Sequence, residues 1–431
     1  MRLILSKLGR VNTVPRLRAV TRPLAAPVDL LAYADAADPL VWLRDTRGFV
    51  GVGEVLRITA TGPERFAELN RRWAEVAAAA EIDDAVQLPG SGLLALGAVS
   101  YSDASPETSV LIVPETLIHR HDDAWFITRV TPQTAGETGA GESRADPTLP
   151  PASAVAPWPG VALDPVLSEE RAAHYQAAVR NLQRRFESGE AQKVVLARSI
   201  SAPLPAGADL RTPLARFASE YLDCWTFAVD GLVGASPETL IRLVDGRATA
   251  LVLAGTAPRH HGDHSADIAA KRFLETAPHI DQEHRLAAQS VIDTLTPHVA
   301  ELTATDDARV LGLPNVWHRA TDVTATPHPG TSALELVSRM HPTAAIAGTP
   351  TGVAVEIIAE VEPHDRGRYS GAVGWIDHSG DGEWAIALRC AQVADGTVTA
   401  WAGGGIVRGS DPLTELKETV VKFTPAVDAF R

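Results

Sequence analysis

Two patterns of hydrophobic and polar residues alternate in the first 131 residues. Short apolar runs, rich in β-branched and aromatic residues, are separated by turn-forming residues, which is typical of buried strands. These runs are Leu40–Leu43, Phe49–Val52, Leu93–Ser100, Ser109–Pro114 and Trp125–Val130. Residues 62–80 instead carry apolar side chains at the spacing of one helix face. Many strands with a single helix predict antiparallel sheet covered by helices.

Helices become more frequent after residue 160. Ser168 precedes two acidic residues, Glu169 and Glu170, which indicates an N-cap and the start of a helix that runs to about Phe186. Strand-like runs follow at Lys193–Arg198 and Trp225–Val229. Further helices are predicted at Ser265–Glu275, Asp281–Leu302, Ser332–Met340, Gly352–Val361 and from about Pro412 to Phe423. The whole chain therefore predicts an α+β fold of antiparallel sheets covered by helices.

Residues 132–160 differ from both neighbours. They are rich in Pro, Gly, Ala, Ser and Thr and contain almost no large apolar residue before Trp158. Such a composition predicts a flexible loop. We expect a strand-rich N-terminal part in residues 1–131, this loop, and a part rich in motifs in residues 161–431, all within one large fold.

Composition and charge exclude several classes of protein. The chain has 431 residues and a formal net charge of −14. Such an acidic chain is not expected to bind nucleic acid or an anionic membrane surface. No apolar run reaches the ~20 residues that a membrane-spanning helix needs. Two cysteines, Cys224 and Cys390, form no disulfide framework. We expect a cytoplasmic protein, and the net charge does not forbid a small anionic substrate.

Lysine is rare in this chain, and one lysine stands in an unusual place. Only five of the 39 basic residues are lysine, and Lys193 opens the apolar run Val194–Ala197. Unlike arginine, lysine can lose its proton when it is desolvated or near other cations, so Lys193 is a candidate general base. The alternative is a lysine at a strand edge whose ammonium reaches water.

Glutamates that follow turns or share a helix face are further candidates. Glu238 follows Ser236-Pro237 at the end of a strand, where it could act as a proton donor or cap a turn. Glu415 and Glu418 are three residues apart, so they share one helix face with Lys422 a turn further on. This face could supply oxygen ligands to Mg²⁺, or form an exposed ion pair. The glycines at 403–405 could expose backbone N–H groups to an anion, or form a hinge.

Taken in order, these stretches resemble the chorismate-utilising enzyme family. The family includes isochorismate synthase, salicylate synthase, anthranilate synthase component I and aminodeoxychorismate synthase component I. The matching stretches are Lys193–Arg198, Gly234–Glu238, Leu253–Thr256, Glu283-His284, Trp317-His318, His341–Gly348, Arg368–Trp375, Gly382–Ala391 and Ala402–Glu418. Within the family, Lys193 and the apolar pair Ala345-Ile346 resemble isochorismate synthase most.

The resemblance implies a reaction and a role for each residue. Isochorismate synthase adds water at C2 of chorismate and removes the C4 hydroxyl. Lys193 would activate the water, Glu238 would protonate the leaving hydroxyl, and Mg²⁺ would be held by Glu283 and Glu418 with support from Glu415. The implied substrate-binding residues are Gly255, Thr256, His318, Ala345, Ile346, Tyr369, Arg389, Gly403, Gly405 and Lys422. By the same resemblance, we expect a monomer.

One position departs from the family pattern. Relatives usually carry an acidic residue three positions before the metal-binding glutamate, where this chain has Ile280. Asp281 or Glu275 could replace that acid. Pro278 also predicts a late start of this helix. Two alternatives to an isochorismate synthase therefore stay open: a salicylate synthase with added pyruvate lyase activity, and a catalytically weak chorismate-binding paralogue.

Overall fold

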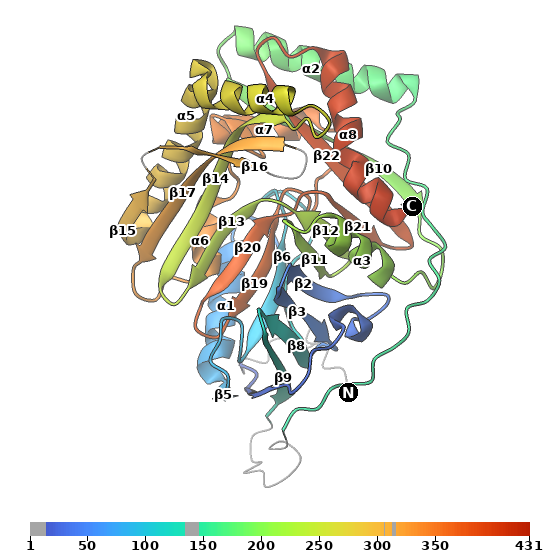
Figure 1. Ribbon diagram of the computed structural model, residues 1–431, viewed down its shortest axis with the longest axis vertical. Helices are drawn as coiled ribbons and strands as arrows, with labels where there is room; N and C mark the ends of the chain where they lie inside the picture. The colour runs from blue at the N-terminus through green and yellow to red at the C-terminus, as the bar shows by residue number, and fades with distance from the viewer. Residues whose placement is uncertain (1–13, 134–145, 306, 313–315) are drawn as a thin grey trace.

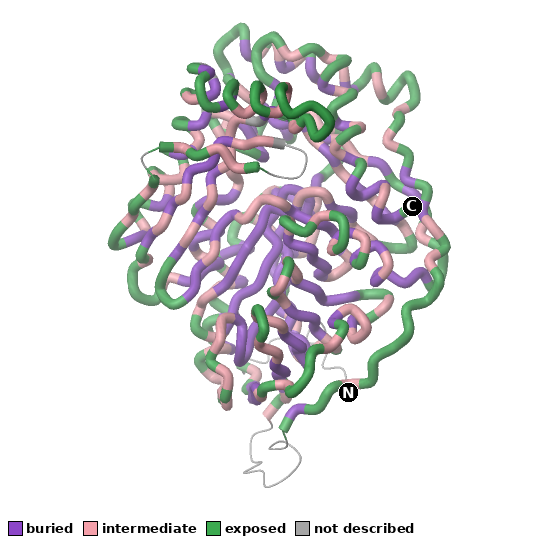
Figure 2. Tube along the Cα trace, in the orientation of Figure 1, coloured by how far each residue is buried: buried purple, intermediate pink, exposed green. Residues whose placement is uncertain are grey.

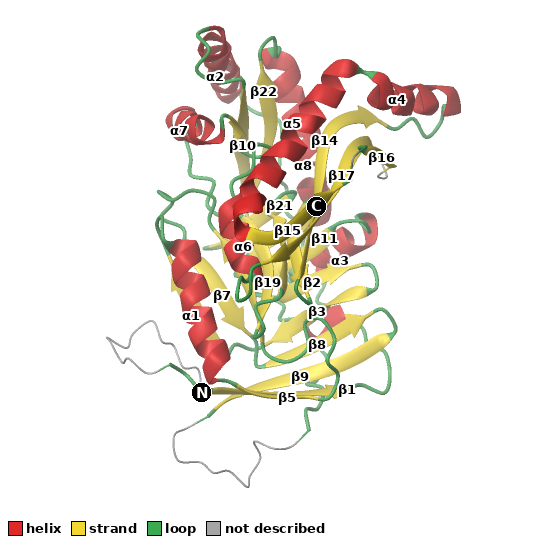
Figure 3. Cartoon of the chain, turned by 90° about the vertical axis from the view of Figure 1, so that its left-hand side faces the viewer, coloured by secondary structure: helices red, strands yellow, loops and turns green. Residues whose placement is uncertain are grey.

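The computed structural model describes residues 14–133, 146–305, 307–312 and 316–431. Within these residues the strands form two large sheets, and the helices lie on the outside of them (Figures 1 and 3). The sheets are antiparallel except for the pairing of β1 with β5, which is parallel. The predicted α+β fold of antiparallel sheets covered by helices is confirmed.

The first sheet has 12 strands in the part of the chain that is described. Their order across the sheet is β18 (Gly348–Thr349), β10 (Lys193–Pro203), β22 (Thr397–Val407), β21 (Cys390–Ala394), β12 (Leu232–Ser236), β11 (Trp225–Val229), β2 (Leu40–Arg44), β3 (Arg47–Val52), β8 (Thr116–His121), β9 (Ala124–Pro132), β1 (Leu17–Pro23) and β5 (Glu81–Asp84). Strand β11 pairs with β2, so this sheet continues from the C-terminal half of the chain into the N-terminal half.

The second sheet has 10 described strands and also joins the two halves of the chain. Its order is β15 (Val299–Ala304), β17 (Val316–Pro327), β14 (Arg247–Pro258), β13 (Thr239–Val244), β20 (Gly382–Ile386), β19 (Ala372–Asp377), β6 (Leu94–Val99), β7 (Ser109–Val113) and β4 (Leu56–Ala60), with β16 (Arg309–Gly312) paired to β17. The junction is the pairing of β19 with β6. The two halves therefore share both sheets.

The helices cover the outer faces of the sheets. They are α1 (Arg65–Ala79), α2 (Glu169–Glu187), α3 (Arg211–Glu220), α4 (His264–Thr276), α5 (Pro278–Leu295), α6 (Ala333–Met340), α7 (Thr351–Val361) and α8 (Pro412–Phe430), with short 3-10 turns η2 (Leu30–Tyr33) and η4 (Thr296–His298). In Figure 1, α2 and α8 lie beside β10 and β22, and α4 and α5 lie beside β14 and β17. None of the described helices is long and apolar enough to cross a membrane.

Three large apolar clusters form the core. One of them joins strands of both sheets and includes Trp42, Phe227 and Trp375. The other two pack the helices against the sheets, one with α1, α2, α6 and α7 and the other with α3 and α8. Figure 2 shows the buried residues concentrated along the central strands and the exposed residues on outer helices and loops. A rigid sheet interior of this kind can hold side chains at its edges in fixed positions.

The predicted helix Asp281–Leu302 is too long. The structure ends α5 at Leu295, forms a 3-10 turn at Thr296–His298, and continues as β15. Pro297 has no N–H to donate to the helix ladder, and Val299–Ala304 instead pairs with β17. This helix also starts three residues before the predicted Asp281: α4 ends at Thr276, and Pro278 opens α5.

Of two other predicted helix ends, the start at Ser168 is confirmed and the end at Phe423 is too early. The N-cap at Ser168 is confirmed, since its side chain accepts a hydrogen bond from the Arg171 backbone N–H. The last helix runs to Phe430 rather than Phe423, with Pro425 inside it. The extra turns bury Ala426, Ala429 and Phe430, and this burial offsets the unfavourable proline.

Candidate active site

Lys193 opens β10 and lies over the glycines of β22. The strand pairs with β22 and, at its start, with β18. A Cβ atom built on Gly405 would lie only 2.8 Å from Lys193 Cε. The missing side chain at Gly405 therefore makes room for the lysine side chain. This contact supports a packing role for part of the glycine run.

Most predicted substrate-binding residues meet in one cavity of about 190 Å³. The strands β10 and β22 form one wall of the cavity, and the residues that precede β19 and β21 form another. Seven of the predicted residues line it: Ala345, Ile346, Tyr369, Arg389, Gly403, Gly405 and Lys422. They come from distant positions in the sequence, so the fold alone brings them together.

The cavity is bordered by three basic side chains. Lys193 and Arg389 form no ion pair with any described carboxylate, whereas Lys422 lies 3.8 Å from Glu418. Burial lowers the pKa of Lys422, the charges of Glu418 and Glu415 oppose this, and the charges of Arg389 and Lys193 lower it further. Three cations close enough to interact create a positive potential that attracts a small anion, despite the negative charge of the whole chain.

The backbone at two lining residues is in the left-handed region. Ser370 has φ 60° and Arg389 has φ 50°. The other described non-glycine residues with positive φ are Asp45, Gln87, Asp122, Asp230, Asp245 and Asp395. Aspartate tolerates this conformation better than most residues, whereas arginine does so at a cost. The structure therefore accepts backbone strain to direct Arg389 toward the cavity.

Glu238 lies in an adjoining cavity of about 360 Å³. Ala345 lines both cavities, so they share a wall. Burial raises the pKa of Glu238 to about 7, and the charge of Lys193 acts against this increase. A carboxyl group with this pKa can hold a proton near neutral pH and donate it. The Ser236 hydroxyl accepts a hydrogen bond from the Glu238 N–H at 3.2 Å, which fixes the turn that presents the side chain.

Gly255 and His318 lie on paired strands but line neither of these cavities. Gly255 has φ 78° and forms a bulge in β14, and the ring of His318 is hydrogen-bonded to its backbone. Burial lowers the pKa of His318, and the charge of Arg389 lowers it further, which indicates that the two side chains lie in the same region. The side chain of Thr256 lies outside the described part of the structure.

The predicted metal ligands are placed only in part. Glu415 and Glu418 lie on α8, and Glu415 is buried next to the backbone of Gly404. Burial raises the pKa of Glu415, a hydrogen bond from Ser410 opposes this, and the charge of Glu418 raises it further. Two carboxylates that repel each other in this way suit a cation. The side chain of Glu283 is not described, and the described residues contain no group of three potential ligands.

Ile280 occupies the place next to Gly255. A Cβ atom on Gly255 would lie 2.5 Å from Ile280 Cγ2, and Ile280 is buried with Leu274 and Ala277. The two acidic residues that could have replaced the usual acid have cationic partners. Asp281 bonds Arg319 and Arg285, each at 2.7 Å, and Glu275 lies 4.0 Å from Lys271. An apolar contact therefore stands at the position where the resemblance in sequence led us to expect an acid.

A comparison with known families identifies the group to which this chain belongs. A family model described as chorismate binding enzyme matches residues 25–431. The chain belongs to the chorismate-binding enzyme family. This assignment agrees with the resemblance seen in the sequence.

Several curated members of the chorismate-binding family are similar in sequence. The isochorismate synthase DhbC of Bacillus subtilis is 33% identical over 261 residues, which cover 58% of this chain and 65% of that protein. The isochorismate synthase EntC of Escherichia coli K12 is 36% identical over 246 residues, which cover 56% of this chain and 63% of that protein. The matches therefore span slightly less than two thirds of these relatives.

Solved structures of family members share the fold along nearly the whole chain. A putative 2,3-dihydroxybenzoate-specific isochorismate synthase, DhbC from Bacillus anthracis, has a TM-score of 0.71 at 27% identity and covers 93% of this chain and 98% of its own. The menaquinone-specific isochorismate synthase MenF from Escherichia coli has a TM-score of 0.77 at 21% identity, covering 97% and 96%. The second likeness concerns the fold alone.

Sequence reasoning missed several cavity residues of this chorismate-binding enzyme. Val195, Ser370, Leu388, Trp401 and Ala402 also line the smaller cavity. Strand alternation could have found Val195 and Trp401, since each lies two positions from a predicted site residue on its own strand. Ser370 follows the predicted Tyr369, and Leu388 precedes the predicted Arg389. Whether they line the cavity depends on the tertiary structure.

Proposed function

We propose that this protein is an isochorismate synthase, which converts chorismate to isochorismate. The observation that carries the proposal is the pair Lys193 and Glu238: Glu238 lines one cavity, and Lys193 packs over Gly405, which lines the adjoining cavity of this family member. A basic amine and a carboxyl group whose pKa is raised to about 7 can serve as a base and an acid in one reaction.

The substrate cavity suits a dianion such as chorismate. Arg389 and Lys422 line it, and Lys193 lies over Gly405, which also lines it. In this proposal Arg389, Lys422 and the backbone N–H groups of Gly403 and Gly405 bind the enolpyruvyl carboxylate. The ring then extends toward Glu238, past Ala345. Charge-assisted hydrogen bonds of this kind are shorter and stronger than neutral ones.

The acid and the base act in one substitution. Lys193 in its neutral form takes a proton from water, and the oxygen of that water forms a bond to C2. The double bonds shift, the bond from C4 to its hydroxyl breaks, and Glu238 donates its proton to the departing oxygen. The water consumed at C2 balances the water released at C4, so the reaction is an isomerisation. General acid and base catalysis together supply the proton transfers.

We also propose Mg²⁺ as cofactor, with Glu283 and Glu418 as ligands and Glu415 in support. When bound, the ion would neutralise the ring carboxylate of the substrate. The repulsion between Glu415 and Glu418 supports this assignment, because a cation would relieve it. Mg²⁺ commonly binds to one or two protein carboxylates and completes its shell with substrate oxygens and water.

One observation favours a second candidate, a catalytically weak chorismate-binding paralogue. The buried Ile280 next to Gly255 provides no charge near the proposed metal ligand, and Asp281 and Glu275 have other partners. We expect weakened metal binding rather than its loss, because the two proposed direct ligands are present.

The test is turnover of chorismate with identification of the product by chromatography, with Mg²⁺ and with a chelator. The proposal predicts isochorismate with Mg²⁺ and loss of turnover with the chelator. Salicylate formed from added isochorismate would instead establish the lyase alternative. Chorismate binding with turnover near background would establish the weak paralogue. Ile280→Asp should lower the Mg²⁺ concentration needed for half-maximal activity, with Ile280→Val as the control.

A further inference from the structure

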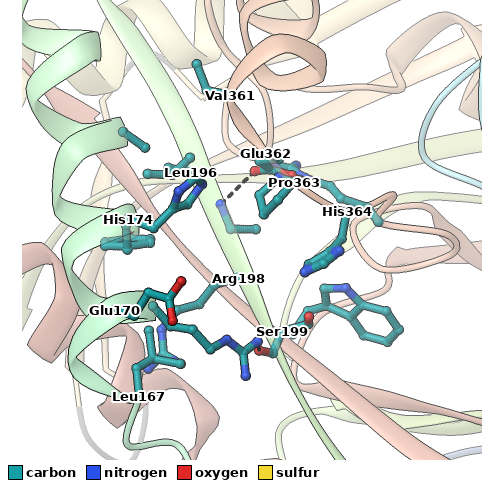
Figure 4. Close-up of a pocket in the computed structure, with 16 residues that line it drawn as sticks. Leu167, Glu170, His174, Leu196, Arg198, Ser199, Val361, Glu362, Pro363 and His364 are labelled. Atoms are coloured by element: carbon teal, nitrogen blue, oxygen red, sulfur yellow. Dashed lines mark hydrogen bonds and ion pairs between the residues drawn. The ribbon is translucent and has the colours of Figure 1, made fainter.

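A second cleft of about 520 Å³ lies along β10, beyond the substrate cavity (Figure 4). Helix α2 forms one side, and the segment 361–366 that follows α7 forms the other. Figure 4 shows Glu170 and His174 on the helix side, with His364 across from them and Arg198 on the strand between. The floor is apolar and includes Leu196, Ala178 and the ring of Tyr175.

Two arginines of this cleft have no carboxylate partner among the described residues. Arg198 donates from Nε to Thr419 Oγ1 at 2.6 Å and from Nη2 to the Pro165 carbonyl at 2.8 Å, while its buried Nη1 has no acceptor there. The Arg171 guanidinium donates to the Ser199 carbonyl, at 3.3 Å, and to no carboxylate in the described part of the chain. A cation removed from water without a counter-charge is unfavourable, so such a place favours a bound anion.

The other charged residues of the cleft do not neutralise Arg171 and Arg198. Glu362 is held by Arg366 at 2.6 Å, so these two charges compensate each other. The exposed Glu170 is the other carboxylate in the lining, against Arg171, Arg198 and two histidines. The N-terminal turns of the 19-residue helix α2 face the cleft and add a partial positive charge. The net potential is positive above an apolar floor.

We propose that this cleft is an effector site for a small organic anion with an apolar body, such as an aromatic carboxylate. The carboxylate lies between Arg171 and Arg198, and the ring packs on the floor formed by Leu196, Ala178 and Tyr175. A cleft of this size accommodates a compact ligand with a few polar contacts.

Two residues connect the cleft to the substrate cavity. Trp401 lines both, and its ring is stacked on Tyr369 with centroids 6.1 Å apart. Arg366 lines the cleft and donates to the carbonyls of Val195 and Ile346, at 2.8 and 2.9 Å, and both of those residues line the substrate cavity. A ligand that moves Trp401 or Arg366 therefore alters the substrate cavity, which couples the two sites.

Calorimetric titration of the full chain with benzoate tests the binding. We expect saturable binding of benzoate and at least tenfold weaker binding of neutral benzamide. Arg171→Glu should weaken benzoate binding at least tenfold, whereas Arg180→Glu, an exposed change on α2 outside the cleft, should leave it unchanged. Arg171 is exposed, so the change is compatible with folding. Arg389→Ala, in the substrate cavity, should leave benzoate binding intact.

A second measurement tests the effector role, and its reading rests on the proposed function. Saturating benzoate should change kcat or the KM for chorismate at least twofold in the native protein and in Arg180→Glu, but not in Arg171→Glu. Absence of saturable binding, or loss of binding in Arg389→Ala together with competition against chorismate, would overturn the proposal. Binding without any effect on turnover would overturn the effector role. Should the chain not turn over chorismate, the titrations still decide whether the cleft binds the anion.

Discussion

Two clusters of basic side chains in this protein have opposite surroundings. Around the substrate cavity, Lys193 and Arg389 have no carboxylate partner among the described residues. Around Asp230, in contrast, every cation is matched. Arg57 bonds Asp230 at 2.5 Å and Glu54 at 2.7 Å, and Arg368 bonds Asp230 at 2.6 Å.

Under the proposed function, the difference separates structural charges from those that bind substrate. Although burial raises the pKa of Asp230, the charges of Arg368 and Arg57 lower it below its ordinary value, so the cluster around Asp230 is neutralised within the protein. The cluster around the cavity is not, and its charges are available to a substrate. We expect changes in the first to affect stability and changes in the second to affect activity.

The largest expected effect is loss of the proposed base. Lys193→Ala should lower kcat toward the upper end of the roughly 10²–10⁴-fold range that general acid and base catalysis supplies. The melting temperature should change little, because Lys193 makes no ion pair within the described residues. Lys417→Ala on α8 is the control and should keep full activity. Full activity of Lys193→Ala, measured as isochorismate formed, would contradict the mechanism.

Loss of the proposed acid should have the next largest effect. Glu238 donates a proton only in its protonated form and its pKa is about 7, so kcat/KM should fall as the pH rises through about 7. Glu238→Gln should lower kcat by roughly 10²-fold or more and remove this decline from the residual activity.

A second buried glutamate provides a matched control for the pH profile. Burial also raises the pKa of Glu383 to about 7, but this residue lies on β20 near Arg242 and lines neither active-site cavity. Glu383→Gln should therefore keep the decline in kcat/KM. Disappearance of the decline in Glu383→Gln, with its persistence in Glu238→Gln, would remove Glu238 from the acid role.

A smaller effect is expected where a residue binds substrate without taking part in proton transfer. Arg389→Ala should raise the KM for chorismate by roughly 10–100-fold, which corresponds to about 1.4–2.7 kcal/mol. Alanine at this position keeps nearly the same strain of the left-handed backbone as arginine. The free energy of unfolding should therefore be nearly unchanged. Initial rates over a range of chorismate concentrations measure the effect. A large fall in kcat at unchanged KM would contradict a pure binding role.

A change in the cluster around Asp230 should have the smallest effect on activity and a clear effect on stability. Asp230→Asn leaves Arg368, whose side chain is 2% exposed, without its closest counter-charge. We expect a loss of about 2 kcal/mol in the free energy of unfolding, with the KM unchanged. Urea unfolding at pH 7 measures this loss. Asparagine tolerates the positive φ of 51° at this position, so the substitution adds no backbone strain to the measured loss of stability.

The control for Asp230→Asn is an exposed pair with the same chemistry. Asp122 also has a positive φ, 54°, and bonds Arg47 at 3.0 Å, but both side chains are about half exposed. Asp122→Asn should change stability little, because water screens this pair. Equal losses in the two variants would mean that burial does not distinguish the clusters.

Local patterns predicted much of the secondary structure, whereas most of the proposed site residues came from the resemblance to a known family. Short apolar runs such as Phe49–Val52 and the N-cap Ser168 appear as β3 and the start of α2, because they depend on nearby residues only. The helix beginning at Asp281 was predicted to run seven residues too far, since residues 299–304 join a sheet through β17, which is distant in the sequence. The metal ligands stay a prediction, and the domain limits at residues 131 and 160 do as well.

By itself, the sequence determined which chemical groups are present and in what order: a lysine before an apolar strand, a glutamate after a turn, and glycines ahead of a final helix. Only the tertiary structure decided which of them meet. Lys193 lies over Gly405 because β10 and β22 are paired, and the pKa of Glu238 is raised because the folded chain buries its carboxyl group. Strand pairing and desolvation depend on residues hundreds of positions apart, and no local pattern records them.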